Sequence, residues 1–175
     1  MRHGMLALAA ALIGCGAFDE FDVVVEDSAT IPGTFGAGQI FAPDYGSSFN
    51  SLNLRADKTF TNNDVSPDDV DAIFVKSVRL EDSEPNLNNL KNVIESVELF
   101  VEAPGVARVK IASGSNFPAG ASADLAVEAM VNLKPYAVQP SMKISAEVKL
   151  KQRPAFTFKL KTVVTLLVDI NLLGA

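Results

Sequence analysis

The sequence predicts an all-β domain, built as an antiparallel two-sheet sandwich of the jelly-roll or Greek-key type. Three observations favour this class. Apolar and polar residues alternate over many short stretches, turn residues separate these stretches at the spacing typical of sandwiches, and few segments show helical spacing. An up-and-down β-barrel is the alternative, and we expect one or two short helices in either arrangement.

The chain is expected to form a single domain over residues 15–175. Of its 175 residues, 48 % are hydrophobic and 21 % are charged, which is the composition of a globular protein. No linker divides it and no internal repeat is evident. A domain of this length buries roughly two-thirds of the surface of its unfolded chain, so it needs no disulfide or metal to fold.

The first strand is expected within residues 18–33, where Phe21, Val23 and Val25 occupy alternate positions before Pro32 and Gly33 end the pattern. Residues 33–50 contain four aromatic side chains among glycines and serines, which indicates a loop or short edge strands. Residues 51–56 alternate briefly and predict a short strand.

The middle of the chain contains the clearest hairpin. Residues 72–81 have the β-branched and aromatic content of a strand. Within residues 85–96, apolar side chains recur at helical spacing and predict a helix of two to three turns. Residues 97–112 then alternate on both sides of Pro104-Gly105, which predicts a hairpin turning at that dipeptide.

The C-terminal third has the strongest strand patterns. Residues 123–133 alternate as a strand, although their Ala and Met content also suits a helix. Residues 142–150 place apolar side chains on one face and charged ones on the other. Residues 156–172 continue the alternation far beyond the usual five or six residues, so we expect a strand that bends or crosses between sheets, with its second half covered on both sides.

The first fifteen residues differ from the rest. Arg2 precedes an uncharged apolar run over residues 5–13. This run is too short to span a bilayer, which takes about twenty residues, and a positive start before a short apolar segment is typical of a secretory signal peptide. The run leads into Leu12-Ile13-Gly14-Cys15, which contains the only cysteine of the chain.

Leu12-Ile13-Gly14-Cys15 resembles the lipobox of bacterial lipoprotein signal peptides, a resemblance that covers residues 1–15 only. It implies cleavage of residues 1–14 as a signal peptide, a diacylglycerol on the thiol of Cys15, and acylation of the new amino group. Several acyl chains anchor a protein stably, since each buried CH₂ contributes about 0.8 kcal/mol. Gly16, in place of aspartate, is compatible with delivery to the outer membrane. A buried cysteine in an apolar helix and an ordinary signal peptide are the competing interpretations.

Cleavage after Gly14 would change the chemistry that the protein has available. The remaining 161 residues would contain no histidine, no tryptophan and, with Cys15 acylated, no free thiol. Ser-His-Asp and Cys-His nucleophilic systems need an imidazole, and zinc, copper and iron sites draw on Cys and His ligands. We therefore expect a protein that is not an enzyme, with no metal and no cofactor other than its acyl anchor.

Residues 61–72 concentrate carboxylates. Four aspartates lie there: Asp64, Asp68, Asp69 and Asp71. Ser66 followed by Pro67 and acidic residues is typical of the start of a helix or 3₁₀ turn. The D-x-[DN]-x-[DN]-G pattern of a calcium loop is absent, so a solvated, capped turn is expected and a calcium site is the alternative.

Charge is distributed unevenly along the chain. Residues 16–103 carry 17 acidic and 5 basic side chains, whereas residues 104–175 carry 4 acidic and 9 basic ones. Six of the basic residues are expected on the polar face of one C-terminal hairpin: Lys143, Lys149, Lys151, Arg153, Lys159 and Lys161. Such lysines hinder aggregation at sheet edges, or they contact anionic headgroups or an acidic partner. The net charge of −6 disfavours nucleic acid as a partner.

The sequence thus predicts a non-catalytic lipoprotein of the cell envelope, anchored in the outer membrane, that acts as a binding or structural module at the membrane surface. An envelope protein or a glycan is its expected partner. A carrier of an apolar ligand in a barrel or sandwich cavity is the alternative, favoured by the many aromatic and aliphatic positions. A carboxylate-based hydrolase, such as a glycosidase, is a third hypothesis.

Overall fold

The computed structural model describes residues 20–54, 58–62, 65–66, 69–83, 89–155 and 157–170. The predicted signal peptide and Cys15 lie outside these residues. The elements follow one another in the order β1 (Glu20–Ile31), β2 (Ile40–Phe41), α1 (Ser47–Asn50), α2 (Lys58–Asn62), β3 (Val70–Asp82), α3 (Leu90–Val93), β4 (Ile94–Ala103), β5 (Val106–Ser115), β6 (Ser122–Val127), α4 (Lys134–Ala137), β7 (Lys143–Leu150) and β8 (Phe158–Ile170).

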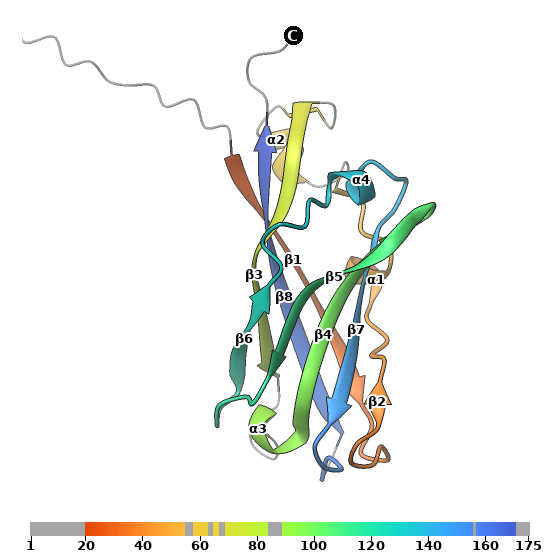
Figure 1. The fold of residues 1–175 in the computed structure, drawn as a ribbon, viewed down its shortest axis with the longest axis vertical. Coiled ribbons are helices and arrows are strands. Elements are labelled where there is room, and N and C mark those ends of the chain that lie inside the picture. The colour runs from red at the N-terminus through yellow and green to blue at the C-terminus, as the bar shows by residue number, and fades with distance from the viewer. Residues whose placement is uncertain are drawn as a thin grey trace, which may run out of the picture.

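The strands form one antiparallel sheet in the order β1-β8-β3-β6-β5-β4-β7-β2. The sheet curls on itself like half of a barrel, as Figure 1 shows. The all-β, antiparallel prediction is therefore confirmed. Two separate sheets, as in a jelly-roll or Greek-key sandwich, are not confirmed, because a short ladder between β5 and β6 joins the two halves at Ala112–Val127 and Ser113–Ala126. In the described residues β1 and β2 are not paired, so the curl is not a closed barrel.

Strand β8 is paired on both sides along nearly its whole length. It pairs with β1 on one side and β3 on the other along its thirteen residues. Its inward side chains, from Phe158 to Ile170, are buried, which confirms the alternating C-terminal strand. The opposite face is only half-buried at Val163 and Leu167, so the prediction that this second half is covered on both sides is wrong. The strand stays between the same two neighbours and does not cross between sheets.

The hairpin predicted over residues 97–112 is confirmed as β4 and β5. Gly105 at its turn has φ +76°, a left-handed conformation that glycine adopts without a Cβ clash. The longer helix predicted within residues 85–96 is wrong for the part described: α3 is a single turn. Ile94 pairs with Leu150 and begins β4, because burial in the sheet outweighs the helical spacing of its neighbours.

Two other segments are shorter than predicted. In residues 51–56 the only strand-like pairing of the described part is an isolated bridge between Leu52 and Met142. In residues 123–133 the strand interpretation holds up to Val127, where β6 ends. The chain then continues through a loop into α4, whose first turn contains Pro135.

Residues 42–52 cover the open side of the curl, between β1 and β7. Tyr45 and Phe49 are buried there, with ring centroids 4.8 Å apart. The carboxylate of Asp27 on β1 accepts a hydrogen bond from the backbone N–H of Phe49 at 3.2 Å. Helix α1 thus contacts both β1 and β7, and it completes the apolar core between the two ends of the sheet.

The elongated domain has two dissimilar ends (Figure 1). We call one the terminal pole: it carries the start of β1, the end of β8, α2 and α4. We call the other the distal pole: it carries α3, the end of β5 and residues 151–155 after β7. Because a strand rises about 3.3 Å per residue, the thirteen residues of β8 separate the two poles by roughly 40 Å.

Candidate anion-binding site

The six basic residues predicted as a surface do not share one hairpin. Strand β7 pairs with β4 and β2, whereas β8 pairs with β1 and β3, so the two strands lie on different sides of the curl. The expectation of a single basic hairpin face is therefore wrong. Lys143 and Lys149 belong to β7, Lys159 and Lys161 belong to β8, and Lys151 and Arg153 lie in the connection between them.

Three of these lysines are bound by carboxylates of neighbouring strands. Lys143 lies 3.7 Å from Glu102, Lys149 lies 2.7 Å from Glu95, and Lys161 lies 2.8 Å from Glu26. The hydrogen bond from Lys161 to Glu26 raises the pKa of that ammonium group, which holds it in the charged form. These pairs are cross-strand contacts that support the sheet, and they take three cations out of the predicted surface.

The other three basic residues lie at or near the distal pole. The guanidinium of Arg153 donates to the backbone carbonyl of Gly33 and fixes the connection after β7 against the loop after β1. Among the ion pairs of the described residues, none involves Lys151 or Lys159. These two ammonium groups are available to a partner.

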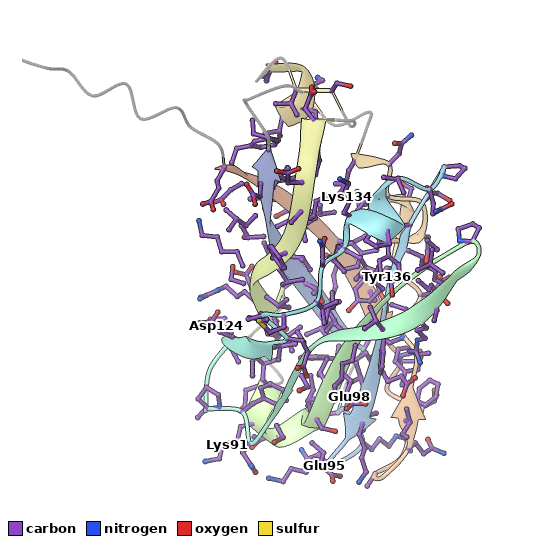
Figure 2. All side chains as sticks on the ribbon, turned by 45° about the horizontal axis from the view of Figure 1, so that its top comes forward. Lys91, Glu95, Glu98, Asp124, Lys134 and Tyr136 are labelled. Atoms are coloured by element: carbon purple, nitrogen blue, oxygen red, sulfur yellow. The ribbon has the colours of Figure 1, made fainter. Side chains whose placement is uncertain are left out.

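A cleft at the distal pole brings Lys151 next to residues that the sequence did not single out. Its volume is about 290 Å³, and it is lined by Lys91, Ile94, Glu95, Asn116, Phe117 and Lys151. Figure 2 shows Lys91 and Glu95 at this end of the molecule, opposite the end that carries Lys134. Four separate segments supply the lining: α3, the start of β4, the turn after β5 and the residue after β7.

Hydrogen bonds of the backbone position the two segments that carry Lys91 and Lys151. Asn89 caps α3, because its side chain accepts from the N–H of Asn92 at 2.9 Å, and this cap orients the turn that carries Lys91. The N–H of Lys151 donates to the carbonyl of Val93 at 2.8 Å. The end of β7 is thereby joined to the end of α3, so Lys91 and Lys151 border the same cleft.

The floor of the cleft is apolar. Ile94 and Phe117 are buried. Asn116 has φ +53°, the left-handed conformation that asparagine tolerates better than most residues, and this turn directs Phe117 inward after β5. A Cβ at Gly114 would lie 3.3 Å from the Phe117 ring, so glycine there leaves room for it. The cleft therefore combines an apolar floor with a polar rim.

The rim is positively charged. Its one carboxylate, Glu95, is engaged by Lys149 at 2.7 Å, which leaves the ammonium groups of Lys91 and Lys151 to dominate the potential. Ammonium groups and the Asn116 amide are hydrogen-bond donors, and charge-assisted bonds to a carboxylate or phosphate are about twice as strong as neutral ones. The arrangement suits an anionic group carried on a compact apolar body.

The acidic segment over residues 61–72 is described only in part. The N–H of Ser66 donates to the carboxylate of Asp69, and the N–H of Asp69 donates to the carbonyl of Ser66, both at 2.9 Å. These bonds are the ones that a capped turn makes. Asp64 and Asp68 lie outside the described residues. Within the described part, no group of three or more His, Cys, Asp or Glu side chains is placed to hold a metal ion.

A second, shallow hollow lies on the outer face of β4, β5 and β6. It contains two carboxylates, Glu98 and Asp124, among serine side chains. Glu98 is ion-paired with Lys110 at 3.2 Å, and Asp124 with Arg79 at 3.5 Å. Both carboxylates are thus engaged in ion pairs with cations of neighbouring strands.

No protein-family model matches the chain, and no curated protein matches its sequence. Among the helices in the described residues, none has the length and apolar content needed to cross a membrane. The assignment of a function therefore depends on the N-terminal motif and on the chemistry of the distal pole.

Proposed function

We propose that this protein is a non-catalytic lipoprotein of the cell envelope, anchored in the outer membrane through Cys15, that binds an acidic partner at its distal pole. The observation that carries the proposal is the four-residue motif Leu12-Ile13-Gly14-Cys15 at the end of a short apolar run. The cleft between Lys91 and Lys151 supports the binding role.

The distance between the anchor and the domain is short. Only residues 16–19 separate Cys15 from Glu20, where β1 begins. The five steps from Cys15 to Glu20 span at most about 18 Å when fully extended. Anchoring at Cys15 would thus hold the folded domain directly above the bilayer and not on a long flexible stalk.

The position of the free cations favours an acidic partner over the headgroups of the anchoring bilayer. Lys91 and Lys151 lie at the distal pole, roughly 40 Å from the start of β1 along the strands. Interactions between exposed charges are screened beyond about 8–10 Å at physiological ionic strength. In an upright domain these lysines would face an envelope glycan or protein.

The apolar interior favours a binding module over a carrier of an apolar ligand. The cavity between α2, β3 and α4 is lined by apolar side chains such as Leu54, Phe60 and Ile73, and its volume is about 10 Å³. That is about the room of one water molecule, whereas pockets for small ligands measure roughly 300–1,000 Å³. The other side chains of the described core are buried hydrophobic ones that belong to a single cluster.

Membrane fractionation tests the anchoring. The full-length gene is expressed in a bacterial host, once unchanged and once as Cys15→Ala, with labelled palmitate in the medium. We expect the unchanged protein to incorporate label and to stay with outer membranes, and the variant to do neither. Unlabelled wild-type protein, or a variant that is retained in membranes to the same extent, would contradict the proposal.

A binding assay tests the distal pole. The lipidated protein in detergent is titrated with polygalacturonate and with polyglutamate, which represent an acidic glycan and an acidic protein segment. Lys91→Glu/Lys151→Glu is compared with Lys58→Glu/Lys134→Glu, which changes the net charge equally at the terminal pole. We expect only the first variant to lose binding. An equal loss of binding in both variants would show a nonspecific effect of net charge. If the wild-type protein binds neither polymer, the proposed binding site at the distal pole is wrong.

A further inference from the structure

We propose that the terminal pole is the membrane-facing surface of the domain, and that bilayer lipid covers the apolar hollow between α2 and α4. This inference rests on the lipid anchor proposed above and adds the orientation of the domain and the surface that meets the membrane. The two poles would then contact different partners: lipid at the terminal pole and an acidic group at the distal pole.

The first support is where the chain leaves the described structure. Glu20 begins β1 at the terminal pole, and Figure 1 shows α2, α4 and the end of β8 at the same end. With at most about 18 Å between Cys15 and Glu20, this pole cannot be far from the bilayer to which Cys15 is attached. The distal pole can reach the same bilayer only if the long axis of the domain lies flat.

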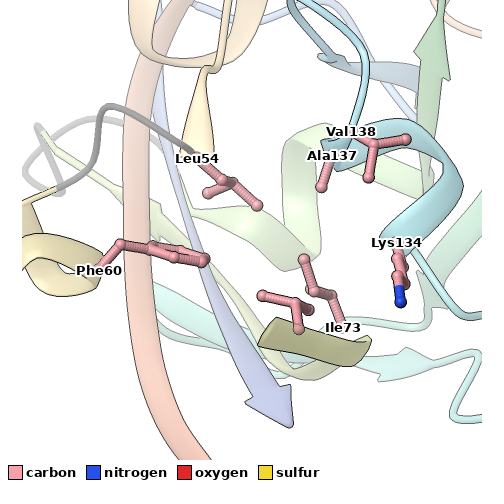
Figure 3. A pocket seen from close by; sticks show the side chains of 7 residues that line it. Leu54, Phe60, Ile73, Lys134, Ala137 and Val138 are labelled. Atoms are coloured by element: carbon pink, nitrogen blue, oxygen red, sulfur yellow. The ribbon is translucent and has the colours of Figure 1, made fainter. Parts of the chain in front are cut away.

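The second support is the apolar hollow itself, which Figure 3 shows from close by. Leu54, Phe60 and Ile73 form one side of it, and Ala137 and Val138 form the other. Val138 is 39 % exposed, one of the few large apolar side chains in the described residues that face solvent. Leu54, Phe60 and Ile73 are themselves buried, so lipid contact would remove mainly the side chain of Val138 from water. Such removal is favourable by about 25 cal/mol per Å² of apolar surface.

Two contacts fix α2 and α4 at this pole. The ring of Phe60 in α2 packs edge-to-face on Phe21 of β1, with centroids 5.3 Å apart. The N–H of Leu133, which precedes α4, donates to the carbonyl of Ile73 on β3 at 2.7 Å. The hollow is therefore part of the rigid sheet framework and is held within a few residues of the point where the chain enters the domain.

The rim composition is that of a surface in contact with the membrane interface. Pro135, Val138 and Pro140 are exposed along and after α4. Lys134 is the one charged residue that lines the hollow. A lysine can lay its aliphatic stem along apolar surface and keep its ammonium group at the headgroup level.

Electrostatic attraction is not the main force expected at this pole. Lys58 and Lys134 are accompanied there by the carboxylates of Glu20, Asp71 and Asp169. Mixed charges of this kind give little net attraction to anionic lipid. Contact should therefore be similar on vesicles of phosphatidylcholine alone and on vesicles that also contain phosphatidylglycerol, which distinguishes it from a headgroup-binding basic patch.

A single-cysteine reporter tests the orientation. Cys15 is the only cysteine of the chain and is blocked once acylated, so Val138→Cys introduces one free thiol. Gln152→Cys, exposed at the distal pole, is the matched control. Each full-length, lipidated variant is labelled with the same environment-sensitive fluorophore and reconstituted in phosphatidylcholine vesicles that contain lipids with a spin-label quencher.

We expect the quencher to reduce fluorescence severalfold more at position 138 than at position 152. The affinity of the fluorophore for lipid is the same in both variants, so the difference reports the orientation of the protein. Flotation of the vesicles in a density gradient checks that the protein is bound to them. If bound protein is quenched equally at both positions, or more at position 152, this inference is overturned and the anchor stands. Protein that does not float with the vesicles would overturn the anchor and this inference together.

Discussion

The hydroxyl of Tyr45 lies 2.8 Å from Oγ1 of Thr162, a residue 117 positions later in the sequence. Both side chains are buried, Tyr45 in the segment that covers the open side of the curl and Thr162 on the inner face of β8. This hydrogen bond connects two polar groups that lie among the apolar side chains of the core. It joins the covering segment directly to β8, one of the two thirteen-residue strands of the sheet.

Replacement of Tyr45 by phenylalanine should destabilise the protein. Tyr45→Phe leaves Oγ1 of Thr162 buried without this partner, so we expect the free energy of unfolding to fall by about 1–3 kcal/mol. Urea denaturation followed by circular dichroism measures the change. The double variant Tyr45→Phe/Thr162→Val should lose less than the sum of the two single variants, and strict additivity would contradict the coupling.

Stability should decrease at alkaline pH because of the same tyrosine. Burial raises the pKa of Tyr45 to about 12 from the ordinary value of 10.0, and this effect exceeds the lowering by its hydrogen bond to Thr162. Between pH 10 and pH 12 the unfolded chain therefore loses a proton that the folded protein retains. The contribution of Tyr45 to the free energy of unfolding is therefore fully present below pH 10. Between pH 10 and pH 12 the free energy of unfolding should fall by about 1 kcal/mol per pH unit.

Denaturation curves of wild type and Tyr45→Phe at pH 9, 10, 11 and 12 check this slope. All other ionisable groups are the same in the two proteins, so the comparison isolates the contribution of Tyr45. The difference in unfolding free energy between the two should therefore narrow as the pH rises above 10. A constant difference across the series would show that Tyr45 does not ionise differently in the folded and unfolded states.

A methyl group at Gly114 should be poorly tolerated. A Cβ there would lie 2.6 Å from Cδ2 of the buried Leu125, so either β5 or the leucine must move. We expect Gly114→Ala to lower the free energy of unfolding by about 1–3 kcal/mol. Gly120→Ala is the matched control, because its Cβ would meet only the carbonyl oxygen of Ser122 at 4.0 Å. Equal melting temperatures for the two variants would contradict the close packing of β5 against β6.

The carboxylate of Asp27 should help to hold the segment around α1 over the open side of the sheet. It accepts the N–H of Ser28 at 2.8 Å and the N–H of Phe49 at 3.2 Å. Asp27→Ala removes both bonds, and we expect a loss of about 1 kcal/mol, comparable to the loss of a helix cap. Hydrogen exchange at the amide of Phe49 measures the local effect. Unchanged protection there would show that α1 is held by apolar packing alone.

Much of the strand content could be predicted because alternation is a local property. Strands β1, β3, β7 and β8 and the β4–β5 hairpin each bury one face, and the two-residue period is visible in the sequence without knowledge of the partners. The long pattern over residues 156–172 was recognisable for the same reason. Its partners were not, since pairing depends on which strands bring their apolar faces to a common core.

The arrangement of the basic residues shows the limit of the sequence argument. Strands β7 and β8 are neighbours in the chain, which favours a hairpin, but each pairs elsewhere and the curl separates them. Lys151 was among the predicted residues, whereas Lys91 and Phe117 were missed because only the topology brings α3 and the end of β5 together. Asn116, directly after a strand, was the one local signal of a left-handed turn at this place.

Mass spectrometry of the protein purified from bacterial membranes tests the central claim most directly. The lipid anchor predicts an N-terminal peptide that begins at Cys15, without residues 1–14, and with the added mass of a diacylglycerol on sulfur. An N-terminus at any other residue, or an unmodified thiol at Cys15, would contradict the anchored-module account.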